Sequence, residues 1–267
     1  MLEATRLRAL AAFALACAGA GQALAECEVQ SGTTRAALVE LYTSEGCSSC
    51  PSADARLGAL GRAAQSPKAS PGLAALNPMA LHVEYWDSLG WKDALAQPAF
   101  TQRQKWLTRA NGHTTIYTPA FFVNGMELRD DSPGGLERAI DAQSRLPSQA
   151  TLRLHSDTLV DGRVQVSVQA SLLKPDAQAR QLVVLLTESG LVSRVSAGEN
   201  SGATLRHDHV ARNWYGPWAL SESTPSASHT LDIQPPGSRR IGVLAFVQDP
   251  RTGEVLQSVS TLRCAAL

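Results

Sequence analysis

Two cysteines, Cys47 and Cys50, stand two residues apart in the stretch formed by residues 40–51. A thiolate is the species that attacks a disulfide, and a second cysteine at this distance can resolve the mixed disulfide that forms. The spacing therefore predicts a redox-active dithiol, with Cys47 as the nucleophile and Cys50 as the resolving thiol.

The residues on both sides of this dithiol predict a strand and a helix that position it. Residues 36–42 are mostly apolar and end in an aromatic residue, which is typical of a buried strand. Gly46 permits a sharp turn, and Pro51 suits the first turn of a helix over residues 52–62, where no N–H is needed. Cys47 is thus expected near free amide groups and the positive end of the helix dipole, both of which stabilise a thiolate.

Residues 116–128 form the second informative stretch. A predicted strand runs into Asn124-Gly125, the strongest short signal for a β-hairpin. Pro119 stands near the start of this strand, where a buried central strand cannot lose an N–H. A cis bond between Thr118 and Pro119 would account for it.

The chain between and after these stretches predicts further elements of an α/β domain. Residues 80–86 alternate as in a second main strand, and residues 87–93 form a loop that Trp91 is expected to anchor. Residues 100–110 carry a helical pattern, and a further helix is predicted over residues 132–145.

The order of strand, Cys-Ser-Ser-Cys-Pro turn, helix, strand and Thr-Pro hairpin resembles the thioredoxin fold. Within that fold, residues 39–54 and 117–125 resemble a secreted bacterial family of thioredoxin-like proteins of unknown function. In thioredoxin-like proteins the proline matching Pro119 is cis and shapes the site that receives a substrate's disulfide. The resemblance therefore implies that Thr118 and Pro119 belong to the active site.

Two features depart from the thioredoxin pattern. The dipeptide Ser48-Ser49 replaces the Gly-Pro of the Trp-Cys-Gly-Pro-Cys signature, so the direction of electron transfer stays open. Glu40 stands near the buried carboxylate that many thioredoxins use in proton transfer, but its register is one residue longer.

The character of the sequence changes after residue 147. Asp161-Gly162 and the run of residues 249–253 have the composition of turns. Strands are predicted over residues 150–154, 164–170, 181–188, 229–233, 241–248 and 254–261. The predicted fold is an α/β thioredoxin-like domain over residues 26–147, followed by an all-β immunoglobulin-like sandwich over residues 148–267.

The N-terminus has the three parts of an export signal. Basic residues are followed by an apolar region and by a small-x-small site that ends at Ala25. The apolar region is too short to span a membrane. Residues 1–25 are therefore predicted to be a signal peptide, and the mature protein to be periplasmic or secreted. The alternative is a lipoprotein signal that ends at Cys17.

Removal of this signal leaves four cysteines. If Cys47 pairs with Cys50, then Cys27 and Cys264 remain, at the two ends of the mature chain. Chain ends often lie close together, and an exported protein retains structural disulfides. We expect a Cys27–Cys264 disulfide; the alternative is two unpaired buried thiols.

Composition excludes several function classes. The chain has 24 basic and 24 acidic residues, so no electrostatic attraction to nucleic acid or to an anionic membrane is expected. No Ser-His-Asp order, P-loop or dinucleotide fingerprint is present. No cofactor is expected, and the predicted partners are proteins that bear thiols or disulfides.

Metal binding is the main alternative for the dithiol. Structural zinc normally takes four ligands, and the chain has no second Cys-x-x-Cys. Copper needs fewer ligands, and His82 or His113 could join the thiolates in a periplasmic copper carrier. His207 and His209 would share one strand face, but without a third ligand a solvated strand is favoured. A protein-binding scaffold with an inactive dithiol is the other alternative.

One aromatic group lies far from these motifs. Trp214, Tyr215 and Trp218 surround Gly216-Pro217. We expect a packed loop that covers the open end of the sandwich, in preference to a contact surface for a partner.

Overall fold

The computed structural model describes residues 26–264, except 130, 131, 133, 159, 160, 176 and 236–239. The predicted signal peptide and its alternative at Cys17 lie outside the described residues. None of the described helices combines the length and the apolar character that crossing a membrane requires.

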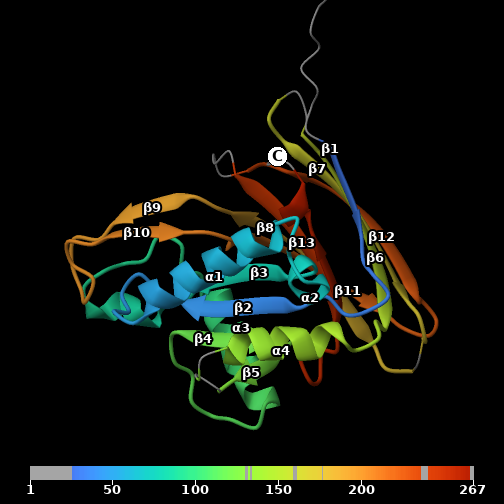
Figure 1. Cartoon of the computed structure of the whole chain (residues 1–267), viewed down its shortest axis with the longest axis horizontal. Coiled ribbons are helices and arrows are strands. Elements are labelled where there is room, and N and C mark those ends of the chain that lie inside the picture. The colour runs from blue at the N-terminus through green and yellow to red at the C-terminus, as the bar shows by residue number, and fades with distance from the viewer. Residues whose placement is uncertain are drawn as a thin grey trace, which may run out of the picture.

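Two β-sheets and a separate hairpin make up the β structure (Figure 1). The larger sheet contains β2 (Leu38–Thr43), β3 (Asn77–His82), β4 (Ala120–Val123), β5 (Met126–Leu128), β8 (Arg180–Glu188), β11 (Val210–Leu220), β13 (Ile241–Gln248) and β14 (Val255–Ser260). The smaller sheet contains β1 (Glu26–Gln30), β6 (Ala150–Thr158), β7 (Val164–Leu172) and β12 (Ser226–Ile233). The hairpin consists of β9 (Leu191–Arg194) and β10 (Thr204–His207).

Strands from both halves of the sequence share these sheets. The larger sheet is mixed, with the order β14-β13-β8-β11-β3-β2-β4-β5, and the smaller is antiparallel, with the order β1-β6-β7-β12. The fold is thus mixed α/β, with one mixed sheet and a separate antiparallel sheet.

Helices cover the part of the larger sheet that lies around β2. They are α1 (Cys50–Ala64), α2 (Pro71–Ala74), α3 (Pro98–Ala110) and α4 (Gly135–Ser144), with the short 3-10 helices η1 (Glu84–Leu89) and η2 (Thr261–Arg263). Both α1 and α3 carry a proline in their first turn, where a missing N–H costs no hydrogen bond.

Alternation along β2 explains why helices lie on both faces of the sheet. Val39 and Leu41 pack in one apolar cluster with residues of α1 and α4. Leu38 and Tyr42 point to the opposite face and pack in a second cluster with residues of α3. Successive side chains of a strand point to opposite faces, so a strand buried on both sides is apolar throughout.

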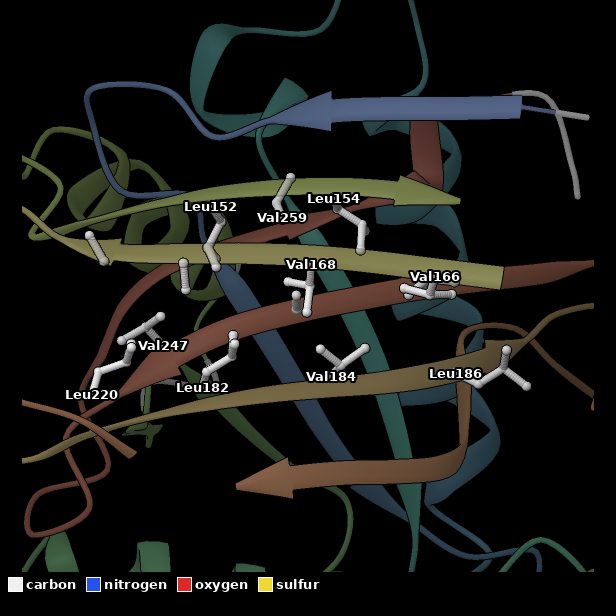
Figure 2. Packing of buried hydrophobic residues seen from close by; sticks show 14 of the residues in the cluster. Leu152, Leu154, Val166, Val168, Leu182, Val184, Leu186, Leu220, Val247 and Val259 are labelled. Atoms are coloured by element: carbon white, nitrogen blue, oxygen red, sulfur yellow. The ribbon is translucent and has the colours of Figure 1, made fainter. Parts of the chain in front are cut away.

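The second half of the larger sheet is covered by the smaller sheet. Figure 2 shows Leu182, Val184 and Leu186 of β8 in one cluster with Val166 and Val168 of β7. The intervening residues of β8 point to the face that α3 covers. The strand β8 is therefore the continuous apolar run expected for a strand buried on both faces.

Several elements predicted from the sequence are confirmed. The strand before the dithiol and the helix after it are β2 and α1, and the helix predicted over residues 100–110 is α3. The hairpin between β4 and β5 turns at Asn124 and Gly125, whose φ angles are 48° and 83°. The bond between Thr118 and Pro119 is cis.

Two predictions about the chain's course are wrong. The strand expected over residues 80–86 ends at His82, and the residues that follow Val83 form the 3-10 helix η1. The loop expected around Trp214 and Trp218 is the strand β11, which pairs with β8 along most of its length. Register shifts around Gly216-Pro217 break its alternation, which concealed the strand in the sequence.

A buried ion pair lies at the interface between α3 and the larger sheet. The guanidinium of Arg103 donates to both carboxylate oxygens of Glu40 at 2.7 Å, and it also donates to Gln248 at 3.1 Å. The Tyr42 hydroxyl donates to Glu40 at 3.0 Å. The pair fixes Glu40 of β2 to α3, so this carboxylate is already fully engaged.

Replacing Arg103 by leucine should strongly destabilise the fold, because Glu40 would keep a buried charge without its cation. We expect Arg103→Leu to lower the free energy of unfolding by about 3–5 kcal/mol in urea titrations. Arg56→Leu is the matched control, since it removes an exposed pair with Glu137 and should cost at most about 1 kcal/mol. Equal losses in the two variants would contradict this account.

A disulfide joins the two ends of the described chain. Cys27 of β1 and Cys264 after η2 are bonded, with Cα atoms 5.8 Å apart and a sequence separation of 237. The chain therefore has the end-to-end bridge expected from the sequence.

Removing this bridge should cost more stability than removing the one between Cys47 and Cys50, because it closes a far longer loop. We expect the double variant Cys27→Ser/Cys264→Ser to lose about 2–5 kcal/mol of unfolding free energy under non-reducing conditions. The double variant Cys47→Ser/Cys50→Ser serves as the control and should lose less. The reverse order would refute the loop-length argument.

Candidate functional site

The dithiol lies in the turn between β2 and α1. A disulfide joins Cys47 to Cys50, with Cα atoms 5.4 Å apart, and Cys50 is the first residue of α1. The Cys47 amide donates to the Ser44 carbonyl, and the Cys50 amide donates to the Cys47 carbonyl, each at 3.2 Å. These two bonds form a tight turn that holds the cysteines at the start of the helix.

Both cysteines are buried. Cys47 is 1% exposed and Cys50 is 0% exposed, whereas Ser48 and Ser49 between them face the solvent. A molecule from outside therefore meets the serines first. Reaction at the Cys47 sulfur requires the surrounding contacts to open.

The second predicted part of the site, Thr118-Pro119, lies next to the dithiol. The Cys47 sulfur is 3.8 Å from the Thr118 carbonyl oxygen. The Trp86 indole N–H donates to the Thr118 hydroxyl at 2.8 Å. The structure thus brings the Thr118-Pro119 segment to the Cys47 side of the dithiol.

A buried polar cluster adjoins the dithiol turn. It consists of two histidines and three carboxylates: His82, His207, Glu45, Asp54 and Asp93. His82 Nδ1 lies 2.7 Å from Asp93, and His207 Nε2 lies 3.1 Å from Glu45. The two imidazole rings are 4.9 Å apart between centroids. Each imidazole is therefore oriented by a carboxylate at one ring nitrogen.

The pKa values of groups in this cluster are shifted, in different directions. Burial raises the pKa of Asp54 above its usual value. Burial opposes protonation of His82, yet the adjoining Asp93 raises its pKa overall. Burial likewise disfavours the charged form of Glu45, but hydrogen bonds from His207 and others lower its pKa. Environments that push pKa values apart are typical of sites that move protons.

Three buried atoms of the cluster have no hydrogen-bond partner among the described residues: Asp54 Oδ1, His82 Nε2 and His207 Nδ1. Asp54 Oδ2 accepts from the Thr43 hydroxyl at 3.1 Å and lies 3.9 Å from His207 Nδ1. Unpaired buried polar atoms are costly and few in folded proteins, so each needs an explanation. Three of them in one cluster next to the dithiol make this cluster part of the candidate site.

The hairpin β9–β10 contributes a loop, residues 195–203, that contacts the dithiol turn directly. The Asn200 side-chain amide donates to the carbonyls of Glu45 and Cys47, both at 2.9 Å. The Glu199 carboxylate accepts from the Ser48 amide at 2.9 Å, and this bond lowers the pKa of Glu199. Residues from the second half of the sequence therefore complete the site.

The prediction of a solvated strand at His207 and His209 is wrong, because both side chains are buried. His207 ends β10 and enters the buried polar cluster, whereas His209 lies in the following turn with a φ of 59°. This turn separates the two rings, so they do not share a strand face. His209 is buried too, and burial lowers its pKa to about 4. His113, the other predicted copper ligand, lies 3.7 Å from Glu127 of β5.

Sequence reasoning missed most of the polar residues around the dithiol. Glu45 and Asp54 flank the cysteines and were visible as charges next to a buried motif, but Asp93 carried no local signal. Glu199 and Asn200 belonged to a stretch that was noticed only for its polarity. Their positions depend on long-range packing.

Two solved structures share this fold. Protein AGR_C_4864 from Agrobacterium tumefaciens matches with a TM-score of 0.64 and 20% identity, over 88% of this chain and 98% of that chain. HBP35 of Porphyromonas gingivalis matches with a TM-score of 0.62 and 14% identity, over 86% of this chain and 76% of that chain. At these identities the likeness concerns the fold.

A search of curated proteins found no match. Residues 38–248, which include the dithiol, Thr118-Pro119, the buried polar cluster and the 195–203 loop, match the sequence profile of DUF1223, described as a protein of unknown function. The chain belongs to the DUF1223 family.

Proposed function

We propose that this protein is an exported thiol–disulfide oxidoreductase that acts through Cys47 and Cys50. The observation that carries the proposal is the close dithiol at the start of α1, with the Thr118 carbonyl 3.8 Å from the Cys47 sulfur. Thr118 and Pro119 would form the platform on which the substrate's sulfur approaches Cys47. The partners would be proteins that bear thiols or disulfides.

The arrangement of β2 to α4 supports a thioredoxin-like domain within residues 26–147, whereas β1 at its start belongs to the smaller sheet. The strands β3-β2-β4-β5 lie in this order; β2 and β3 are parallel, and β4 and β5 form an antiparallel hairpin. The helix α1 links β2 to β3, and α4 follows β5. The second half, residues 148–267, supplies β8, β11, β13 and β14 of the larger sheet and β6, β7 and β12 of the smaller sheet. These strands pack face to face, which supports an immunoglobulin-like sandwich.

Two disulfides and the export pattern of residues 1–25 support a periplasmic or secreted location. Disulfides persist in such compartments and are rare in the cytosol. The bridge between Cys27 and Cys264 has a structural role in this proposal, while the Cys47–Cys50 bridge opens and closes.

The structure holds the dithiol in its oxidised state, as a disulfide between Cys47 and Cys50. A substrate thiolate attacks the Cys47 sulfur, a mixed disulfide forms, and Cys50 leaves as a thiolate. A second substrate thiolate then attacks the substrate's sulfur in the mixed disulfide and releases Cys47. The substrate dithiol becomes a disulfide, and the protein gains two electrons; the reverse sequence reduces a substrate disulfide.

Removal of either cysteine should affect exchange differently. Cys47→Ser should abolish exchange with a small disulfide, because the nucleophile is lost. Cys50→Ser should still attack but should accumulate the mixed disulfide, because the resolving thiol is lost. Mass spectrometry of the trapped adduct, together with the exchange rate, checks both. Equal exchange rates for wild type and Cys47→Ser would rule out the proposed function.

The buried polar cluster is the proposed acceptor for the proton that Cys50 must lose before it attacks. Asp54 follows Cys50 by four residues in α1, so their side chains lie on the same face of the helix. Burial raises its pKa above the usual range of an aspartate, and its Oδ1 is unpaired among the described residues, so it accepts a proton more readily than an exposed aspartate does.

Asp54→Asn should therefore slow resolution of the mixed disulfide by at least about tenfold at pH 7, because the amide cannot accept the proton. Single-turnover measurements that follow the disappearance of the mixed disulfide isolate this step. Asp161→Asn, in the exposed turn before β7, is the control and should resolve at the wild-type rate. Wild-type resolution in Asp54→Asn would exclude Asp54 as the acceptor.

A further inference from the structure

The carboxylate of Glu199 accepts a hydrogen bond from the backbone amide of Ser48, the residue after Cys47. Its Oε2 accepts from the Ser48 N–H at 2.9 Å, although Glu199 itself is exposed and stands 151 positions further along the chain. Amide groups at the start of a helix are natural donors to an anion. Here the chain supplies that anion from its own second half.

The Cys47 sulfur has two polar neighbours among the described residues. The Thr118 carbonyl oxygen lies 3.8 Å from the sulfur, and the Ser49 hydroxyl lies 3.4 Å from it, where either group can donate. A thiolate gains from donors and positive charge and loses from nearby carboxylates and carbonyls. Glu199 both removes the Ser48 donor and adds a negative charge.

The hairpin that carries Glu199 is attached to the body largely through side chains. Its strands pair with each other and belong to neither main sheet, and in Figure 1 it extends alongside α1 at the edge of the molecule. Besides Glu199, Asn200 donates to the carbonyls of Glu45 and Cys47. In the strands of the hairpin, His207 and Ser193 bond the Glu45 carboxylate, and Leu205 is buried. For the loop to leave the turn, the side-chain bonds of Glu199 and Asn200 to the turn have to break.

We propose that Glu199 and Asn200 regulate the dithiol: in the closed arrangement they keep Cys47 protonated and covered. A protein partner that draws the 195–203 loop away frees the Ser48 amide and removes the Glu199 carboxylate from the dithiol turn. The thiol proton then passes to solvent, and the thiolate becomes available for exchange. The physiological purpose of this control rests on the proposed oxidoreductase function, but the effect on Cys47 does not.

The test measures how fast iodoacetamide alkylates Cys47 as a function of pH. A Cys50→Ser background, gently reduced, makes Cys47 the free thiol while the Cys27–Cys264 disulfide stays intact. Glu199→Gln keeps an acceptor for Ser48 but removes the charge, and Glu199→Ala removes both. We expect alkylation at pH 7 to rise by about threefold to tenfold, more in Glu199→Ala, with the titration of Cys47 moved to lower pH.

Asn200→Ala should act differently, because it weakens the attachment of the 195–203 loop to the dithiol turn but keeps the negative charge of Glu199. The alkylation rate should rise at high pH, where Cys47 is already ionised, and the titration midpoint should move little. Glu222→Gln, in the exposed turn between β11 and β12, is the matched control and should leave both quantities unchanged.

Unchanged rates and midpoints in both Glu199 variants would overturn the inference, and an unchanged high-pH rate in Asn200→Ala would overturn the covering role. Alkylation needs no disulfide substrate. A protein that fails to exchange disulfides but shows the Glu199 effect would refute the proposed function and leave this inference standing. A protein that exchanges disulfides but shows no effect of the Glu199 variants would leave the proposed function standing and refute this inference.

Discussion

The pairing of β11 with neighbours on both sides is the constraint on which the site depends. Along one edge it forms an antiparallel ladder with β8, and along the other it meets β3 at the parallel pair Val210 and Ala80. One sheet therefore runs through both halves of the chain, and its apolar residues are buried on both faces. The β9–β10 hairpin comes directly before β11 in the chain, so this pairing places the hairpin near the end of β2. Its 195–203 loop therefore lies on the dithiol turn.

The fold around the dithiol was predictable because its signals are local. The apolar run of β2, the proline after Cys50 and the Asn124-Gly125 turn each specify a conformation within a few residues. The strands β1 and β11 lack such signals. β1 (Glu26–Gln30) alternates polar and apolar residues over only five positions, too few to stand out, and Gly216-Pro217 interrupts β11. Pairing with distant strands fixes both.

The residues of the candidate site likewise fall into those with a local sequence signal and those placed by long-range packing. The cysteines and Thr118-Pro119 stand in short recognisable motifs, and the structure brings them together. The buried polar cluster takes its members from five separate segments, and single polar residues read as solvated surface until packing encloses them. The buried carboxylate sought at Glu40 is committed to Arg103, while Asp54 occupies the position on α1 that faces the same side as Cys50.

The bond between Cys27 and Cys264 makes the described chain a covalent ring. A single cut by a protease in any loop inside this ring opens it without separating the pieces, which stay joined through the two sulfurs. The strands on either side of the cut also remain held in their sheets. Release of a fragment requires both a cut and a reductant strong enough to open this bridge, so damage to the backbone and loss of the fold become separate events.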